Sequence, residues 1–345
     1  MRKKLVVLCI ALCNSAIGFA APQEPLFSIV EKEQKPYLAT LKDLVSIESG
    51  SRDREGLDKI SQLIFNRLKM LGGHVEFIEP GENTYRMHDT PDRPGRMVKA
   101  EFKGSGTKKI LLIAHMDTVY LKGMLAKQPF RIDGDRAYGL GISDDKQGIA
   151  LILHTIDTLQ KLKFNQYGKI TVLINGDEEI SAPAARAYFS KLGAEHDVTF
   201  SCEASQVKSD RVALTTAGIA AVNLNITGKA SHAGAAPEFG RNALEELSFQ
   251  IQQMRDLSDP KEGIKMNWTL ATAGTNRNVI PAVAFATADV RVLKKESFDV
   301  VEAKVRERVK TQQISDAKVE VSFERRRPPL VMSPRSLQVA EHAKK

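Results

Sequence analysis

The stretch TVLINGDEEISA, residues 171–182, joins an apolar run to three consecutive carboxylates. Residues 171–174 are β-branched or aliphatic, a composition that favours a buried strand. Asp177, Glu178 and Glu179 follow almost at once. Neighbouring like charges repel one another, and a strand end in water gains nothing from them. The stretch therefore predicts a sheet strand whose end carries a chemical function.

Apolar strands alternate with helices on both sides of this stretch. Strands are expected at MVKAEF (97–102), KKILLIAHMD (108–117), GKITVLING (168–176) and DVTFSCEAS (197–205). Helices are expected over 36–72, at DDKQGIALILHTIDTLQKL (144–162) and at SAPAARAYFSKLG (181–193). This order predicts an α/β fold with a mostly parallel sheet covered by helices.

The pattern changes near Thr216. From there to about residue 327 the order strand–helix–strand–strand–helix–strand predicts an inserted α+β sandwich. We therefore expect a signal peptide at 1–21, the first part of a catalytic domain at 22–215, and a second domain at 216–327. Residues 328–345 would begin the return to the catalytic domain.

The N-terminal residues MRKKLVVLCIALCNSAIGFAAPQEP are typical of a secretory signal, with a basic start and an apolar run too short for a membrane span. The sequence thus predicts a periplasmic or secreted protein. Cys9 and Cys13 lie in this leader, so cleavage would leave Cys202 alone and no internal disulfide. The formal charge of +8 is too scattered to indicate a nucleic-acid partner, and Arg325–Arg327 is expected to be a solvated strand end.

Acidic residues and one histidine recur at the ends of the predicted strands. His115 and Asp117 follow one strand, Asp144 and Asp145 open the next helix, and Glu203 follows a later strand. In an open α/β sheet all these positions line one crevice, where so many carboxylates require a cation. One imidazole with several carboxylates suits zinc, or cobalt or manganese, better than calcium or magnesium.

The spacing suggests how these groups divide the work. His115 and Asp117 are two apart on an extended segment, so Asp117 can orient the imidazole. Glu178 and Glu179 point in different directions, so one can bind metal while the other holds a water. Taken alone, Asp144–Asp145 is commonly a helix N-cap and Glu178–Glu179 a common helix start. Their joint occurrence in one crevice favours the metal site. The remaining histidines of the first domain are expected at the surface or in helix packing: His74, His88, His154 and His196.

Six motifs, in order, resemble those of the aminoacylase/carboxypeptidase family of two-zinc exopeptidases. They are AHMDTVYLKG, YGLGISDDKQG, NGDEEIS, CEAS, ITGKASHAGAAPE and ADVR. The resemblance extends from about residue 30 to about residue 335. Within the family, the chain is most similar to bacterial glutamate carboxypeptidases, which remove C-terminal glutamate from folates.

The resemblance implies a role for each crevice residue. His115 and Glu203 would bind one zinc ion, Asp144 would bridge both ions, and Glu179 would bind the other. Glu178 would be the general base, and Asp117 would orient His115.

The second domain resembles the family's lid and dimerisation domain, which implies a homodimer. His232 would reach the partner's active site and stabilise the oxyanion, although it could instead be a polar turn residue. Asn278 and Arg291 would face a small-molecule or peptide substrate with a free C-terminal carboxylate, which the Arg291 fork would bind. Arg327 is a further candidate, with a surface ion pair as its alternative role. No nucleic acid is implied, and no membrane after signal cleavage.

The chain departs from the family pattern in two places. Gln147 stands where the family usually has a small residue. The family's chain also returns to the first domain with a late histidine ligand, whereas this sequence ends at Lys345 and the setting of His342 does not match that motif. We therefore expect a chain that lacks the C-terminal part of the catalytic domain and holds at most one zinc ion tightly.

The sequence as a whole predicts a zinc-dependent exopeptidase that releases a C-terminal amino acid, most readily glutamate from folate-like or N-acyl substrates. Two alternatives stay open: an aminoacylase, dipeptidase or deacylase of the same family, or a truncated, catalytically impaired dimer-forming protein.

Overall fold

The computed structural model describes residues 23–204 and 211–343. They form two compact units, the first ending at Ala204 and the second beginning at Ser205. The signal peptide predicted for residues 1–21 lies outside the described residues. Among the described helices, none combines the length and the apolar composition that crossing a membrane requires.

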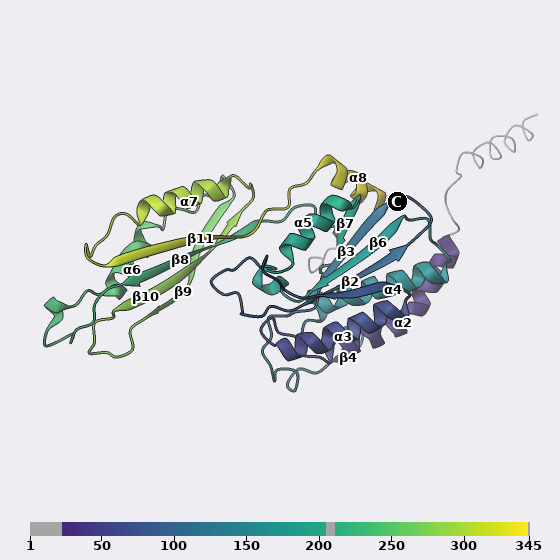
Figure 1. The fold of residues 1–345 in the computed structure, drawn as a ribbon, viewed down its shortest axis with the longest axis horizontal. Coiled ribbons are helices and arrows are strands. Elements are labelled where there is room, and N and C mark those ends of the chain that lie inside the picture. The colour runs from purple at the N-terminus through teal and green to yellow at the C-terminus, as the bar shows by residue number, and fades with distance from the viewer. Residues whose placement is uncertain (1–22, 205–210, 344–345) are drawn as a thin grey trace, which may run out of the picture. The chain divides into compact units, whose positions relative to one another are not determined.

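The first unit is built on a five-stranded sheet (Figure 1). Its strands, in spatial order, are β1 (His74–Ile78), β2 (Met97–Lys103), β6 (Lys169–Asn175), β3 (Lys109–His115) and β7 (Val198–Ser201). Strand β3 pairs in parallel with both β6 and β7, whereas β2 pairs antiparallel with β1 and β6. The predicted α/β class is confirmed, and the sheet is mixed. A helix connects β3 to β6 and another connects β6 to β7, as parallel neighbours require, but a loop without a helix connects β1 to β2.

Helices cover both faces of this sheet (Figure 1). The helices are α2 (Gln23–Val45), α3 (Arg54–Met70), α4 (Gln147–Lys161) and α5 (Arg186–Glu195). Successive residues of β2 point to opposite faces: Val98 and Ala100 pack with α2, α3 and α4, whereas Met97 packs on the side of α5. A two-stranded ribbon of β4 (Arg131–Asp133) and β5 (Arg136–Tyr138) lies outside the sheet.

The second unit is a two-layer α+β sandwich. Its antiparallel sheet has the order β11 (Lys318–Arg327), β8 (Gly218–Thr227), β10 (Val283–Val292) and β9 (Ile264–Ala273). Helices α6 (Ala243–Gln253) and α7 (Ser297–Arg308) share one core with alternate residues of β8 and β10. The chain order is the predicted strand–helix–strand–strand–helix–strand. Helix α8 (Pro334–Ala343) follows β11.

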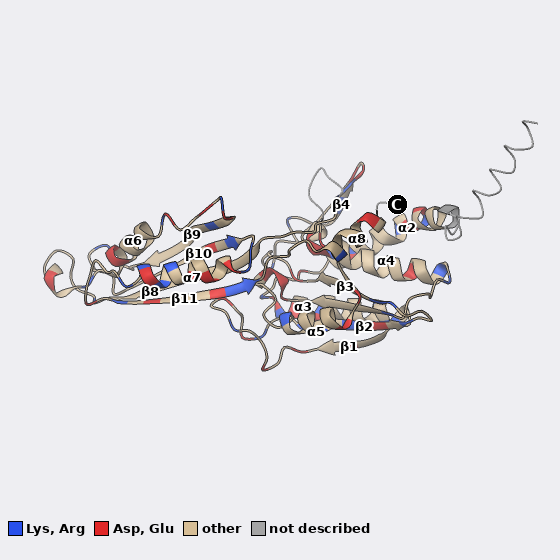
Figure 2. Cartoon of the chain, turned by 90° about the horizontal axis from the view of Figure 1, so that it is seen from above, with Lys and Arg blue, Asp and Glu red and all other residues tan. Residues whose placement is uncertain are grey.

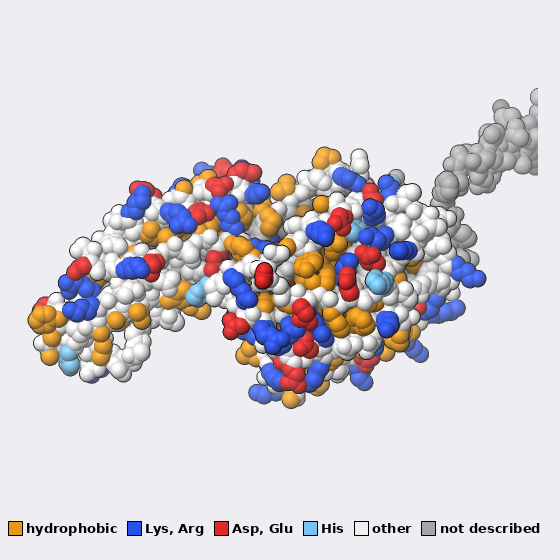
Figure 3. Space-filling model, in the orientation of Figure 1, with side chains coloured by type: hydrophobic (Ala, Val, Ile, Leu, Met, Phe, Trp, Pro, Cys, Tyr) orange, Lys and Arg blue, Asp and Glu red, His pale blue; other side chains and the backbone are white. Residues whose placement is uncertain are grey.

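Charges of both signs are interspersed over the face shown in Figure 3. The three consecutive arginines 325–327 form the end of β11 (Figure 2). There Arg325 pairs with Asp299 at 2.6 Å and with Glu302 at 2.9 Å, both on α7. Arg325 is thus an exposed strand-end residue tied to α7, whereas Arg326 is 15% exposed and pairs with Glu324 at 3.3 Å.

We predict that Ile152→Ala destabilises the first unit by about 2–5 kcal/mol. Ile152 is 1% exposed and packs between α4 and the sheet, so truncation leaves a cavity. Its neighbour Leu151 is 47% exposed, and Leu151→Ala should cost less than about 0.5 kcal/mol. Urea unfolding followed by circular dichroism compares the two variants. Equal losses would contradict the assignment of the buried face of α4. The only tryptophan, Trp268, reports the second unit separately.

Candidate metal centre

The predicted ligands meet at one edge of the first sheet because three parallel strands end there. His115 is the last residue of β3, Glu178 and Glu179 lie in a short turn (Glu178–Ile180) after β6, and Glu203 follows β7. Asp144 and Asp145 lie in the turn Ile142–Lys146, which leads into α4. Carboxyl ends of parallel strands share an edge, so distant parts of the sequence converge.

The distances show that these side chains form one cluster. His115 Nε2 lies 2.9 Å from Asp144 Oδ1 and 3.4 Å from Glu203 Oε1. Two groups, each with ligand atoms within 4.8 Å of one another, share His115: one adds Asp144 and Glu179, the other Asp145 and Glu203. The three carboxylates predicted as ligands therefore lie around the predicted imidazole ligand, with Asp144 and Glu179 in one group and Glu203 in the other.

Asp117 holds both sides of this cluster. Its backbone carbonyl is hydrogen-bonded to His115 Nδ1 at 3.0 Å, and its carboxylate lies 3.3 Å from the same nitrogen. It also accepts hydrogen bonds from the amides of Glu178, at 3.0 Å, and Glu179, at 3.1 Å. The Ser51 hydroxyl donates a further bond of 2.8 Å. One fully buried aspartate thus contacts the imidazole and fixes the turn that carries both glutamates.

Asp177, the first of the three consecutive carboxylates, points away from the cluster. It accepts hydrogen bonds from Asn175 Nδ2 at 2.8 Å and from the amides of Ala184 and Ala185 at 2.7 and 3.2 Å. Burial raises the pKa of Asp177 to about 6, even though these hydrogen bonds oppose the change. Its role is to fold the chain back after β6, so only Glu178 and Glu179 remain for chemistry.

Asp145 has a larger part than a helix-start residue. Neither it nor Asp144 caps α4, which begins without a side-chain cap. Asp145 is fully buried and its Oδ2 accepts the His115 amide at 3.2 Å, whereas the Asp144 side chain is 61% exposed. Asp144 is therefore the carboxylate on the solvent side of the cluster. Asp145 is on the buried side, where it holds the backbone of His115.

Gln147, which departs from the family pattern, joins the start of α4 to the end of β7. Its Nε2 donates to the Cys202 carbonyl at 3.0 Å. Next to it, a Cβ at Gly148 would lie 2.3 Å from that carbonyl oxygen and 2.4 Å from Asp145 Oδ1. Glycine is required at 148 because the two backbones approach so closely.

The pKa values of the cluster show that its carboxylates lack enough neighbouring positive charge. Burial and repulsion from Asp144 raise the pKa of Glu179 to about 7. Burial and repulsion from Glu203 raise the pKa of Asp145 to about 8. Burial alone would lower the pKa of His115, but its hydrogen bonds to carboxylates, led by Asp117, raise it. One imidazole among several carboxylates that resist ionisation fits a divalent transition metal ion.

Of the candidate substrate residues in the second unit, His232 and Asn278 lie together. His232 forms a β-bridge with Val279, and the Asn278 carbonyl accepts the Ala233 amide at 2.9 Å. His232 Nδ1 accepts the amides of Gly234 and Ala235, at 3.2 and 3.0 Å. The neutral imidazole therefore carries its proton on Nε2, where it can be donated.

The other two candidates, Arg291 and Arg327, lie close to each other elsewhere in the sheet. Both are opposite Ile219 of β8, one on β10 and the other on β11, so they lie in one row across the sheet. Arg291 also pairs with Asp289 at 2.8 Å. The row is at the far end of β10 from the His232 loop, roughly 25 Å away at about 3.3 Å per residue. Within one chain these two pairs do not meet.

A third group of possible ligands, Glu33, His154 and Asp157, is a helix-packing network. His154 is hydrogen-bonded to Glu33 at 2.7 Å and to Thr40 at 2.9 Å, which joins α4 to α2. Lys161 pairs with both Glu33 and Asp157 and neutralises them. The expected packing role of His154 agrees with these contacts.

Comparisons with known proteins match both units. Residues 97–203 match the model described as Peptidase family M28, and residues 214–317 match the Peptidase dimerisation domain. Over 303 residues the chain is 42% identical to Carboxypeptidase G2 of Pseudomonas sp. (strain RS-16), covering 88% of this chain and 71% of that protein. It is 29% identical over 206 residues to Acetylornithine deacetylase of Proteus mirabilis, covering 59% of this chain and 49% of that protein.

Solved structures share the fold at low sequence identity. The di-peptidase Dug1p of Saccharomyces cerevisiae has a TM-score of 0.72 at 14% identity, covering 91% of this chain and 81% of that one. The aminopeptidase PepT of Bacillus cereus has a TM-score of 0.68 at 22% identity, covering 90% and 81%. The candidate metal-binding side chains lie together at the sheet edge, and the chain is 42% identical to a carboxypeptidase. With the matches above, this shows that the chain belongs to the aminoacylase/carboxypeptidase (M20) family of metallopeptidases.

Proposed function

We propose that this chain is a zinc-dependent exopeptidase that hydrolyses the amide bond before a C-terminal amino acid, with glutamate of folate-like or N-acyl substrates as the preferred leaving group. One observation carries the proposal: His115 and its surrounding carboxylates form one cluster in a chain 42% identical to Carboxypeptidase G2.

The cluster has ligands suited to zinc. His115 and Glu203 would hold one ion, Asp144 would lie between two ions, and Glu179 would bind the second. Because three protein ligands are proposed for the first position and only two for the second, we expect one tightly held ion per chain. Bound zinc lowers the pKa of water and polarises a carbonyl group.

Glu178 is the residue proposed to take the proton from the attacking water. Its backbone amide is fixed by Asp117, and it precedes the proposed ligand Glu179 in the same short turn. After the attack, the protonated Glu178 carboxyl group can act as a general acid and give the proton to the leaving nitrogen.

The second unit is proposed to act as a lid and to form a homodimer. Its match to the Peptidase dimerisation domain supports this. Since Arg291 lies at one end of β10 and the loop with His232 lies beyond the other end, one substrate cannot reach both in the same unit. We propose that the His232 Nε2–H of the partner chain stabilises the oxyanion. Asn278 would lie beside it, and Arg291, aided by Arg327, would bind the substrate carboxylate through its planar fork.

A periplasmic or secreted location is proposed from the signal sequence at residues 1–21. It is compatible with the single described cysteine. Burial raises the pKa of Cys202 to about 12, so its thiol stays protonated and resists oxidation.

We predict that Glu178→Gln lowers kcat by about 10²–10⁴-fold, because the amide cannot accept a proton. The zinc content should be unchanged, since Glu178 is not a proposed ligand. Release of glutamate from folate measures turnover, and elemental analysis measures zinc. Glu82→Gln, which changes an exposed glutamate, is the matched control. Turnover near that of the wild type would contradict the role of Glu178.

We predict that zinc binding to the metal-free chain releases protons and tightens as the pH rises from 6 to 8. Glu179, with a pKa raised to about 7, is partly protonated near neutral pH, and His115, whose pKa is raised by its carboxylate partners, also carries a proton that a ligating nitrogen cannot keep. The ion must displace these protons. Calorimetric titration in two buffers of different ionisation enthalpy counts them. A dissociation constant that does not change with pH would refute the prediction.

A parallel assay separates the proposed substrate class from its alternative. Similarity to Acetylornithine deacetylase favours a deacylase as second candidate, because the same metal cluster would serve both reactions. Folate, N-acetylornithine and a dipeptide are compared at equal concentrations. We expect the highest kcat/KM for folate, and a preference for N-acetylornithine would favour the deacylase.

A further inference from the structure

Lys146 directly follows the two aspartates of the metal cluster and is 1% exposed, the largest of the fully buried side chains described. Burying an ammonium group is costly unless it is paired, and methionine would fill the same volume without that cost. None of the roles proposed above uses this residue. Its contacts indicate what the buried charge does.

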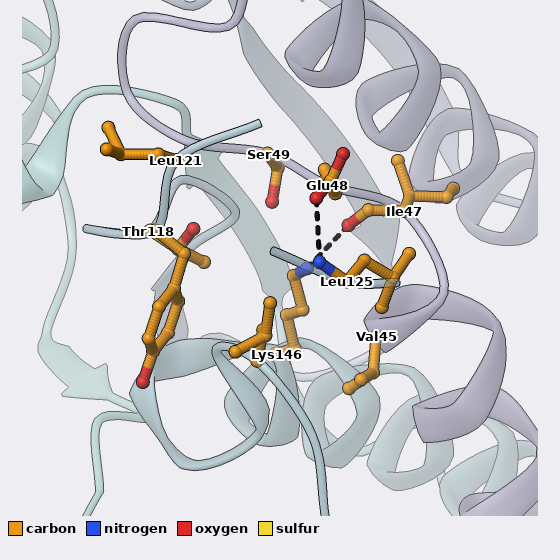
Figure 4. A pocket seen from close by; sticks show the side chains of 10 residues that line it. Val45, Ile47, Glu48, Ser49, Thr118, Leu121, Leu125 and Lys146 are labelled. Atoms are coloured by element: carbon orange, nitrogen blue, oxygen red, sulfur yellow. Dashed lines mark hydrogen bonds between the residues drawn. The ribbon is translucent and has the colours of Figure 1, made fainter. Parts of the chain in front are cut away.

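The ammonium group joins the Ile142–Lys146 turn to the chain beyond α2. Lys146 Nζ donates to the Ile47 carbonyl at 2.7 Å (Figure 4). At the other end of the residue, the Lys146 amide donates to the Gly141 carbonyl at 3.0 Å and closes the turn. The turn that carries Asp144 and Asp145 is thereby tied to residue 47, 99 positions away.

The segment 47–51 also contacts the opposite side of the metal cluster. Ser51 donates to Asp117, the carboxylate that holds His115 and the Glu178–Ile180 turn. The segment is itself fixed to the continuation of β3, because the Thr118 amide donates to the Ser49 carbonyl at 2.9 Å and the Ser51 amide to the Thr118 carbonyl at 3.1 Å. Segment 47–51 thus links the two halves of the ligand set, and Lys146 is its contact with the aspartate half.

A small cavity lies beside this contact (Figure 4). It is lined by Lys146, Glu48, Ser49 and Thr118 among others, and has room for about one water molecule. Ser49 Oγ is buried and has no hydrogen-bond partner among the described residues. Lys146 has two further N–H donors besides the one given to Ile47. One water could accept a hydrogen bond from Lys146 and bond to the Ser49 hydroxyl.

We propose that Lys146 is a positioning residue of the metal centre. Through the Ile47 carbonyl and a buried water shared with Ser49, its ammonium group holds the Ile142–Lys146 turn against segment 47–51, in the geometry in which Asp144 binds metal. This inference rests on the proposed metal-dependent function. It assigns Lys146 no contact with substrate, so its effect should appear in metal binding before any turnover is measured.

The first experiment compares Lys146→Met with Lys161→Met, a lysine of the same helix region that pairs with Glu33 and Asp157 instead. Dissociation constants for zinc and cobalt(II) are measured by competition with a chromophoric chelator, and the visible spectrum of the cobalt form reports ligand geometry. Lys146→Met should weaken binding about 10–100-fold and shift the cobalt bands, as loss of an outer partner of a metal ligand does. Lys161→Met should leave the two dissociation constants within twofold of the wild-type values and the cobalt bands unshifted.

The thermal midpoint of the metal-free proteins separates positioning from folding. We expect Lys146→Met to keep a cooperative transition while losing metal affinity. Unchanged affinity and an unchanged cobalt spectrum in Lys146→Met would overturn the inference and leave the proposed function intact. A wild-type chain that binds neither ion would overturn the proposed function itself, and this inference with it.

If Lys146→Met does not fold, Ser49→Ala decides. It removes only the hydroxyl group that faces the cavity and leaves every described hydrogen bond in place. We expect a metal affinity weakened about threefold and a shifted cobalt spectrum, because the proposed water loses one of its partners. Affinity and spectrum identical to those of the wild type would overturn the inference.

Discussion

The crowding of carboxylates around His115 is the constraint on which the first unit depends. Asp144, Asp145, Glu179 and Glu203 offer oxygen atoms within metal-ligand reach of one buried imidazole. Such a cluster is stable only if a cation or bound protons compensate its charge. The raised pKa values of Glu179 and Asp145 express that demand. The surrounding fold acts as a frame: its contacts hold these carboxylates close together although they repel one another.

That frame is made of buried polar contacts between segments far apart in the chain. Asp117 joins β3 to the turn after β6 through two backbone amides, and Ser51 joins both to the loop after α2. Gln147 and Gly148 bring the start of α4 against the end of β7. Because most of these contacts fix backbone groups, the ligands are held in place before any ion binds, which lowers the entropic cost of binding.

The second unit presents its candidate groups at two ends of one sheet. The row of Arg291 and Arg327 provides positive charge for a carboxylate, whereas the His232 loop provides a neutral donor with its proton on Nε2. Their separation along β10 explains why a dimer suits the proposed chemistry. In a dimer, one chain can supply the His232 donor and the other the arginines, which lie too far apart within a single chain.

The sequence by itself determined the α/β class, the order of elements in the second unit and the identity of the metal-ligand candidates. It could do so because the strand–helix alternation is a local pattern and because the carboxyl ends of parallel strands must share an edge, which brings His115, Glu179 and Glu203 together. Only the tertiary structure decided that Asp177 turns inward, that Asp145 braces the cluster, and that β1 and β2 make the sheet mixed. It alone revealed Ser51 and Lys146, whose partners lie 66 and 99 positions away. Contacts at such distances follow no periodicity in the sequence. They depend on how whole elements pack, so no local pattern of residues indicates them.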